Sequence, residues 1–137
     1  MAEGCIFCKI TRRQAPSSIV YEDEKILAFM DIRPVSEGHT LVIPKQHCVD
    51  IFDTPDELLA CTYIVTRQVS AAVKKATRAD GISIVQQNGK AAGQDIFHMH
   101  VHIIPRFEGK KMQHFNELSV ASREELDAVA ARIRKEL

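Results

Sequence analysis

Short hydrophobic runs alternate with polar stretches over the first third of the chain, a pattern typical of β-strands joined by turns. Residues 19–21 and 26–30 are two such runs, and the polar residues between them predict a hairpin. A third run at residues 40–43 ends at Pro44, and we expect residues 31–38 to form the loop before it. The pattern therefore predicts three consecutive strands.

Two later segments repeat hydrophobic residues every three or four positions, which is the spacing of an amphipathic helix. Residues 54–57 combine an N-cap Thr, a Pro at the first helical position and a Glu at the third, so we expect a long helix from there to Asp80-Gly81. Its hydrophobic stripe consists of Leu58, Cys61, Val65, Val69, Ala72 and Ala76. Ser122 and Glu125 predict the start of a C-terminal helix. The stripe of this second helix consists of Leu126, Val129, Ala130, Ile133 and Leu137.

Hydrophobic runs at residues 82–85 and 99–104 lie between the two helices and predict a fourth and a fifth strand. Strands joined by hairpin-like links and interrupted by one long helix favour an α+β fold with an antiparallel sheet over a doubly wound parallel sheet. We therefore expect a five-stranded antiparallel sheet with one long helix and a C-terminal helix, in a single domain over residues 1–137.

The composition agrees with a globular domain and argues against several classes of function. Of the 137 residues, 45% are hydrophobic and 26% are charged, which is enough for one core. The 18 Lys and Arg residues balance the 18 Asp and Glu residues, so no global field attracts nucleic acid or an anionic membrane. The sequence has no hydrophobic run of about 18 residues and no signal-peptide pattern, and we expect a cytoplasmic protein.

Three histidines, His98, His100 and His102, alternate with hydrophobic residues in the fifth predicted strand. Successive side chains of a strand point to opposite faces, so we expect the three imidazoles on one face, with neighbouring Cα atoms about 6.5 to 7 Å apart. Two chemistries suit such a cluster. One neutral imidazole can attack a phosphorus atom while another donates to phosphate oxygen, or the three rings can bind Zn²⁺ with one position open for water.

The loop just before the histidines, residues 86–95, contains two glycines and several amide side chains. Backbone N–H groups and neutral donors of such a loop can hold an anion, although Asn88-Gly89 is also typical of an ordinary hairpin turn. Its position beside the histidines favours a phosphate site.

Cys5 and Cys8 form a Cys-x-x-Cys pair near the start of the chain. In a reducing compartment the pair can be a redox-active dithiol, two small buried side chains, or half of a tetrahedral Zn²⁺ site. The sequence has neither a second Cys-x-x-Cys nor the nearby histidine pair of a zinc finger. Cys48 and Cys61 have no such partners, and we expect them to be packing residues.

The alternation of His and hydrophobic residues at positions 98–104 resembles the signature of the histidine triad (HIT) family. The other matching segments, in chain order, are residues 5–10, 28–32, 38–45, 88–89, 92–94 and 105–106. The similarity covers residues 5–106, and the C-terminal helix fits the smaller bacterial and archaeal members of the Hint-like branch. The resemblance implies the HIT-like fold and a homodimer that pairs its sheets across a two-fold axis.

The resemblance also implies a nucleotide hydrolase or transferase that acts on purine nucleotides, such as an adenosine phosphoramidase or a dinucleoside polyphosphate hydrolase. His100, the middle histidine, would attack the α-phosphorus and form a covalent nucleotidyl-histidine that water then cleaves. His102 would donate to the phosphate, and His39 would belong to the same polar network. The implied phosphate cradle also includes Asn88, Gly93, Gln94 and Asp95.

The nucleoside part of the site follows from the same resemblance. Asp31 matches the position that holds the ribose hydroxyls, since a carboxylate can accept hydrogen bonds from two of them. The hydrophobic walls of the base pocket would be Phe7, Ile10, Phe29, Ile32 and Leu41. Some members carry Ser at the position of Asp95. Because an ionised Asp can only accept, we expect Asp95 to offer its backbone N–H and to turn its side chain away.

A subset of the family with an N-terminal cysteine pair binds a structural zinc ion through that pair and two histidines. The corresponding ligands here would be Cys5, Cys8, His47 and His98. Such a site is closed and leaves no position for water. Two alternatives remain open: a zinc-dependent hydrolase that uses the three alternating histidines as ligands, and a nucleotide-binding sensor or interaction module with little turnover.

Overall fold

The computed structural model describes residues 3–112 and 118–137. The elements are α1 (Ile6–Thr11), β1 (Ile19–Glu22), β2 (Ile26–Met30), β3 (Thr40–Pro44), α2 (Asp56–Thr77), β4 (Gly81–Gln86), the 3₁₀ turn η1 (Lys90–Ala92), β5 (Val101–Arg106) and α3 (Arg123–Arg134). The strands form one antiparallel sheet in the order β1-β2-β3-β5-β4. The predicted α+β fold with five antiparallel strands, one long helix and a C-terminal helix is confirmed.

Strand β5 lies between β3 and β4 and carries one of the three alternating histidines inside the sheet. His102 is paired with Leu41 of β3 and with Val85 of β4. Its neighbours Val101 and Ile103 are buried in the core that α2 and α3 cover. The side chain of His102 lies on the opposite face, as the alternation along a strand requires.

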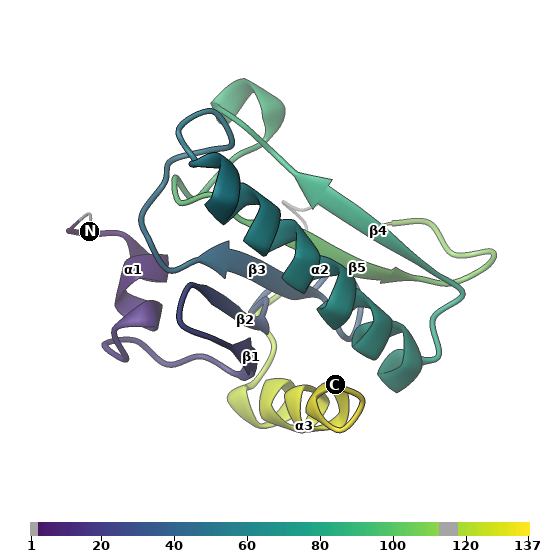
Figure 1. Cartoon of the computed structure of the whole chain (residues 1–137). Helices are drawn as coiled ribbons and strands as arrows, with labels where there is room; N and C mark the ends of the chain where they lie inside the picture. The colour runs from purple at the N-terminus through teal and green to yellow at the C-terminus, as the bar shows by residue number, and fades with distance from the viewer. Residues whose placement is uncertain (1–2, 113–117) are drawn as a thin grey trace.

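The sheet separates two hydrophobic cores, one on each face. Helices α2 and α3 pack on the same face (Figure 1), where the buried residues include Ala28, Met30, Val42, Val69, Val73, Leu126 and Ile133. The short helix α1 covers the other face, where the buried residues are Phe7, Ile10, Leu27, Phe29, Leu41 and Ile43. Alternate residues of β2 enter different cores, which explains why every residue of that strand is buried.

Helix α1 is not predicted from the sequence, because its six residues are too few to show a helical period. The Sγ atom of Cys5 caps this helix by accepting a hydrogen bond from the backbone N–H of Cys8 at 3.4 Å. The helix therefore brings the two cysteines within one turn and buries Phe7 against the sheet.

The predicted start of the long helix is one residue too early. Pro55 is the N-cap of α2, and the helix begins at the following residue. The hydroxyl of Thr54 donates to the backbone oxygen of Asp50 at 2.7 Å, so it belongs to the preceding turn and does not cap the helix. The predicted start of α3 is correct, because Ser122 accepts a hydrogen bond from the N–H of Glu125 at 3.1 Å.

The last strand begins later than predicted, at Val101 rather than at Met99. The backbone N–H of Met99 donates to the carbonyl of Cys48 at 2.7 Å, so this part of the chain is held by the loop after β3. His98 and His100 lie before the first paired residue of β5. Sheet pairing therefore does not force all three histidines onto one face.

Gly38 determines how closely the loop before β3 approaches α2. Its φ is +103°, and a Cβ atom there would lie 2.6 Å from Cγ2 of Thr77. We expect Gly38→Ala to lower the free energy of unfolding by about 1 to 3 kcal/mol, because alanine is strained at this φ and the contact must open. Gly109→Ala is the matched control, since Gly109 has φ +78° but no atom within 4 Å of the Cβ position. Urea unfolding measures both, and equal losses would contradict a role for the contact with α2.

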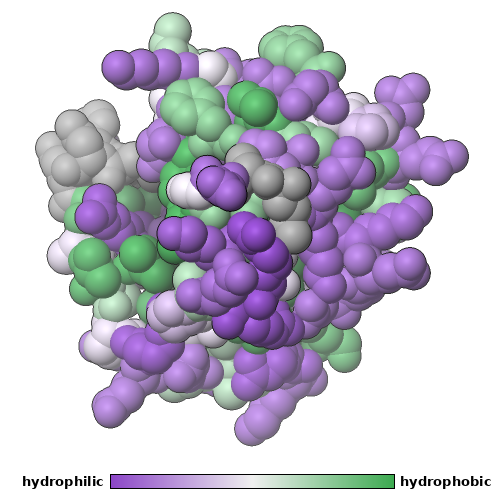
Figure 2. All heavy atoms as spheres, turned by 90° about the vertical axis from the view of Figure 1, so that its left-hand side faces the viewer, coloured by the Kyte–Doolittle hydropathy of each residue, from purple (hydrophilic) through white to green (hydrophobic). Residues whose placement is uncertain are grey.

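The face of the molecule that carries α1 is mostly hydrophilic, with hydrophobic residues exposed in small groups (Figure 2). Small groups of this kind are normal on a protein surface. Within residues 3–112 and 118–137, no helix has the length and hydrophobicity needed to cross a lipid bilayer.

Candidate active site

A cavity of about 270 Å³ opens between α1 and the sheet, where β2 ends and β5 begins. The predicted site residues that line it are Phe7, Ile10, Phe29, Asp31, Ile32, Leu41, Asp95, His100 and His102. Hydrophobic side chains of α1 and β2 thus meet imidazole and carboxylate groups in one cavity. This combination suits a ligand with an aromatic part and an anionic part.

Seven further residues line the cavity that the sequence does not indicate as site residues. The additional lining residues are Ile6, Ala15, Pro16, Ser17, Met30, Ile96 and Arg123. Ile6 lies four residues before Ile10 on the same helix. Residues four apart lie on one face of a helix, so this spacing could have indicated that Ile6 shares the position of Ile10 on the cavity wall. Arg123 has no comparable local signal, because it reaches the cavity from helix α3.

Two amide side chains of the predicted phosphate loop, those of Asn88 and Gln94, hold the loop in place, and neither of them lines the cavity. The Oδ1 atom of Asn88 accepts a hydrogen bond from the N–H of Ile51 at 2.8 Å. The Oε1 atom of the buried Gln94 accepts from the N–H of Gly89 at 2.7 Å, and its Nε2 donates to the carbonyl of Val49 at 2.6 Å. Both side chains therefore fix the loop against the segment that follows β3.

Two backbone N–H groups of this loop are already used within it. The N–H of Gly93 donates to the carbonyl of Lys90 at 3.0 Å, and that of Gln94 donates to the carbonyl of Gly89 at 3.1 Å. Gly93 itself has φ +94°, where glycine is favoured. In this conformation the anion cradle expected from the resemblance lacks both of these donors.

Asp95 lies on the cavity wall, although its side chain was expected to turn away. Burial is the main cause of the altered pKa values of Asp31 and His100, but the charge of Asp95 acts on both groups. The carboxylate is therefore close enough to influence the electrostatics of the cavity. A carboxylate repels an anion, so the group of Asp95 that can favour a bound anion is its backbone N–H.

A chain of hydrogen bonds fixes the tautomers of His39 and His102. The backbone N–H of Val35 donates to Nδ1 of His39 at 3.0 Å, so the proton of this neutral ring is on Nε2. That Nε2 lies 2.9 Å from Nδ1 of His102, which we assign as the acceptor. The proton of His102 is then on its own Nε2, and this ring lines the cavity. His102 can therefore donate a hydrogen bond to a bound anion.

Burial keeps these two rings uncharged. It lowers the pKa of His39 from 6.5 to about 3 and the pKa of His102 from 6.5 to about 4, so both are neutral at pH 7. The Nε2 atom of His39 also lies 3.4 Å from Oδ2 of Asp31. Because the ring is neutral, this contact is not an ion pair, and the assignment of tautomers stands.

His100 is 5% exposed and lines the cavity. Its Nδ1 donates to the backbone carbonyl of His98 at 2.7 Å, so the Nε2 of the neutral ring carries a lone pair. Burial lowers the pKa of this imidazole, which favours the neutral form. The ring also packs edge to face with Phe7, with centroids 5.1 Å apart. An oriented neutral imidazole is the form that acts as a nitrogen nucleophile.

A cluster suited to a metal ion is formed by the N-cap Cys5 and Cys8 of α1 together with two histidines. The potential ligand atoms of Cys5, Cys8, His47 and His98 all lie within 4.8 Å of one another. The Sγ of Cys8 is 3.3 Å from Nδ1 of His47, and the Sγ of Cys5 is 3.4 Å from Nδ1 of His98. Tetrahedral zinc bonds of about 2.0 to 2.3 Å place ligand atoms roughly 3.3 to 3.8 Å apart, so this donor set fits zinc.

A further contact orients one ligand of this cluster. The Nε2–H of His98 donates to the backbone carbonyl of Pro44 at 2.7 Å, which leaves the lone pair of Nδ1 on the side of the cysteines. Hydrogen bonds of this kind are typical of histidines that bind metals. The same residue offers its backbone carbonyl to His100. His98 thus connects the cysteine cluster to the cavity.

The three alternating histidines do not converge on one point. His98 belongs to the cysteine cluster, whereas His102 forms a second group with Asp31 and His39. Among the residues that the structure describes, neither group includes His100. The geometry therefore gives no support to a zinc hydrolase with the three histidines as its ligands.

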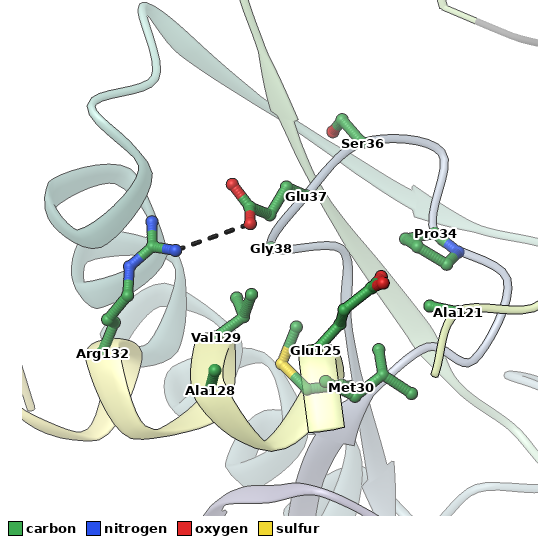
Figure 3. A pocket seen from close by; sticks show the side chains of 11 residues that line it. Met30, Pro34, Ser36, Glu37, Gly38, Ala121, Glu125, Ala128, Val129 and Arg132 are labelled. Carbon is green, nitrogen blue, oxygen red and sulfur yellow. Dashed lines mark ion pairs between the residues drawn. The ribbon is translucent and has the colours of Figure 1, made fainter. Parts of the chain in front are cut away.

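Figure 3 shows a second cavity, of about 370 Å³, between the loop before β3 and helix α3. Glu37 and Arg132 form an ion pair there, with 3.5 Å between nitrogen and oxygen. No histidine or cysteine of the described residues lines this cavity, so it offers no comparable nucleophile. Met30 lines both cavities.

Asp31 makes the stability of the protein depend on pH. Burial raises its pKa from 3.8 to about 6, so folding favours the neutral carboxyl group, and stability falls as the pH rises from about 4 to 6. We expect Asp31→Asn to remove this cost and to raise the free energy of unfolding at pH 7 by up to about 3 kcal/mol. The amide oxygen can still accept the hydrogen bond from the N–H of Arg33.

Thermal unfolding of wild type and Asp31→Asn between pH 3.5 and 8 measures this difference. The two melting temperatures are expected to converge below about pH 4, where both side chains are neutral. A difference that stays constant over this range would contradict the ionisation of Asp31 as its cause.

The family described as "HIT domain" matches residues 12–109. An uncharacterised HIT-like protein of Methanocaldococcus jannaschii is 49% identical over 105 residues, which cover 77% of this chain and 81% of that protein. An adenylylsulfatase of Arabidopsis thaliana is 44% identical over 108 residues, which cover 79% of this chain and 55% of that protein.

Solved structures extend the similarity to the whole fold. A HIT-like protein from Bartonella henselae, described as involved in cell-cycle regulation, has a TM-score of 0.95 and 40% identity, and the match covers 100% of this chain and 98% of the other. A zinc-bound histidine triad family protein from Mycobacterium smegmatis has a TM-score of 0.86 and 38% identity, covering 97% of this chain and 92% of the other.

Proposed function

Because the chain belongs to the histidine triad (HIT) family, we propose that it is a nucleotide hydrolase or transferase that cleaves at an α-phosphate through a covalent intermediate on His100. The family match and the similarity to an adenylylsulfatase support the general activity. The proposed substrates are purine nucleoside phosphoramidates or dinucleoside polyphosphates. One observation carries the mechanism: the Nδ1 of His100, a residue that lines the cavity, donates to a backbone carbonyl, so the Nε2 of the neutral ring, the form that burial favours, keeps its lone pair.

The reaction consists of two displacements at the same phosphorus atom. The Nε2 lone pair of His100 attacks the α-phosphorus, a P–N bond forms, and the bond to the leaving group breaks. A leaving amine takes up a proton from solvent, whereas a leaving nucleotide departs as its phosphate anion. Water then attacks the phosphorus and gives up a proton to solvent, the P–N bond breaks, and the nucleoside monophosphate leaves with the imidazole neutral again.

The remaining residues of the cavity bind and orient the nucleotide. The Nε2–H of His102 donates to phosphate oxygen, and a fixed donor of this kind stabilises the charge that develops in the transition state. His39 sets the tautomer of His102 and is therefore a positioning residue. Asp31 accepts from the ribose hydroxyls, and the backbone N–H of Asp95 faces the phosphate. The hydrophobic residues of α1 and β2 hold the base.

We also propose that the cluster of Cys5, Cys8, His47 and His98 holds a structural zinc ion. The donor set, the short distances between donors and the zinc-bound relative from Mycobacterium smegmatis support this proposal. A zinc ion there would connect the start of α1 to the chain segment just before β5. It would thereby hold in place the two segments that carry Phe7 and His100 on the cavity wall. Cysteines that bind zinc must stay reduced, which supports a cytoplasmic location.

The edge of the sheet supports the proposal of a homodimer. β4 is an edge strand, and Ile84 in it is 44% exposed. Ile64 of α2 is also 49% exposed, and Tyr63 lines a shallow groove together with Ile84. Edge strands with exposed hydrophobic residues are surfaces that a second copy of a chain can cover. Sedimentation of the purified protein tests this, and a monomer at micromolar concentration would contradict it.

Trapping of the intermediate tests the proposed mechanism. Wild-type protein mixed with a phosphoramidate that carries ³²P at the α-phosphorus and quenched within milliseconds is expected to retain label, whereas His100→Ala is not. Substrate consumption without labelled protein would exclude the covalent route. Loss of activity on chelation without any label would favour a zinc hydrolase. Nucleotide binding without turnover would favour a sensor.

A further inference from the structure

Helix α3 places a cation on the wall of the nucleotide cavity. Arg123, its first residue, lines the cavity, and the other charged residues of the described lining are Asp31 and Asp95. A positive side chain in the first turn is unfavourable for the helix itself, because the N-terminal end of a helix carries partial positive charge. Another interaction must therefore account for an arginine at this position.

Arg123 lies at the opposite end of the cavity from His100. Its Nη1 donates to the hydroxyl of Ser18, just before β1, at 2.7 Å. β2 and β3 separate β1 from β5, so three strand spacings of about 4.8 Å put the two ends roughly 14 Å apart. A nucleotide with its phosphate at His100 and its ribose at Asp31 therefore points its base toward Arg123.

The guanidinium group is held in place by a buried hydroxyl. Ser18 is 3% exposed, and its hydroxyl donates to Oδ1 of Asp127 at 2.6 Å while it accepts from Arg123. The N–H of Ala121 donates to the carbonyl of Ile32 at 2.8 Å, which binds the start of α3 to the cavity wall. Within the part of the chain that the structure describes, the side chain of Arg123 makes no hydrogen bond besides the one to Ser18. Its remaining N–H groups are therefore available to a ligand.

We propose that Arg123 recognises the base edge of the nucleotide and makes the cavity selective for 6-oxopurines, guanine and hypoxanthine, over adenine. This inference rests on the proposed function, in which the cavity holds a purine nucleotide. A 6-oxopurine presents two adjacent acceptors, O6 and N7, which match the parallel N–H donors of a guanidinium group. Adenine keeps N7 but has an amino donor in place of O6, so one donor of Arg123 would face another donor.

A phosphate group of the substrate is another acceptor that an arginine can bind, but the surroundings of Arg123 do not favour phosphate there. Ser18, to which Arg123 donates, directly follows Ala15, Pro16 and Ser17, which also line the cavity. The groups suited to phosphate, the nucleophilic Nε2 of His100 and the Nε2–H donor of His102, lie at or just before the start of β5. The guanidinium group of Arg123 therefore lies at the hydrophobic end of the cavity, where the proposed function places the base.

Calorimetric titration with GMP, IMP and AMP tests the proposal without any need for turnover. We expect wild-type protein to bind GMP and IMP about 10- to 100-fold more tightly than AMP. Arg123→Met is expected to bring the three affinities within about threefold of one another. Arg132→Met is the matched control, since Arg132 lies on the same helix but lines the second cavity (Figure 3), and it should retain the wild-type ratio.

Two further measurements keep the test informative if Arg123→Met folds poorly. Arg123→Lys keeps the positive charge but lacks two parallel donors, and it is expected to lose most of the ratio. 7-Deaza-GMP, which lacks the N7 acceptor, is expected to bind wild-type protein about 10-fold more weakly than GMP.

The outcomes separate this inference from the proposed function. Equal or tighter binding of AMP by wild-type protein would overturn the selectivity. An equal loss of all three affinities in Arg123→Met would assign the arginine a structural role. Selective binding of GMP and IMP without hydrolysis of any phosphoramidate would support the inference and reject the catalytic proposal. Binding of none of the three nucleotides would reject the proposed function itself.

Discussion

His100→Asn is expected to lower kcat for a nucleoside phosphoramidate by about 10⁴-fold or more, while the affinity for the nucleoside monophosphate changes by less than about fivefold. The Nε2 of His100 forms the bond to phosphorus in the proposed mechanism, and an amide has no comparable nucleophile. The groups that bind the product, at Asp31 and along the hydrophobic wall, belong to other residues. Rapid-quench kinetics and calorimetric titration measure turnover and affinity separately.

A second variant distinguishes loss of the nucleophile from damage to the site. His100→Gly leaves a space where the ring packs against Phe7, and imidazole added to the solution is expected to restore part of its activity. A kcat near the wild-type value in either variant would contradict the assignment of His100. Parallel losses of turnover and affinity would indicate that the ring supports binding rather than chemistry.

Cys8→Ser is expected to reduce bound zinc from about one ion per chain to far less, and to lower the melting temperature by about 10 °C or more. Cys8 is 0% exposed, and its Sγ lies 3.3 Å from Nδ1 of His47 and 3.5 Å from Nδ1 of His98. Loss of this thiolate therefore removes a ligand that joins both histidines. Elemental analysis and differential scanning calorimetry of protein purified without chelator measure the two effects.

Cys61→Ser is the matched control for the zinc site, because Cys61 is a free cysteine on α2 outside the cluster. It is expected to keep the full zinc content and most of the thermal stability. Wild-type protein that contains no metal would refute the zinc proposal. Equal zinc content in Cys8→Ser and wild type would show that the metal is bound elsewhere.

The strands and the two longer helices could be predicted because each one repeats a burial pattern of its own. The alternation along β5 places Val101 and Ile103 in one core and His102 on the other face, as the sequence indicates. The same alternation does not reveal that His98 belongs to the cysteine cluster whereas His100 lines the cavity. That difference arises because the chain there is held by Cys48 and not by sheet pairing.

Features that depend on distant residues could not be found from local patterns. The position of Arg123 beside the cavity depends on a hydrogen bond to Ser18, which is 105 residues away in the chain. The hydrogen bond from the N–H of Ile51 to Asn88 likewise forms only when the loop packs against the segment that follows β3, so no local pattern predicts it. Resemblance to a family gave part of the cavity lining, but the rest of the lining and the hydrogen-bond partners of these residues required the structure.

Backbone peptide groups determine which ring nitrogen carries the proton in both imidazoles of the cavity, His100 and His102. One peptide N–H, at Val35, determines the tautomer of His39 and through it that of His102, and one peptide carbonyl, at His98, determines the tautomer of His100. Substitution of a side chain leaves such groups unchanged, so sequence alignment cannot detect their importance. Proline at position 35 is the exception, since it would delete the donor while altering no residue that contacts a nucleotide.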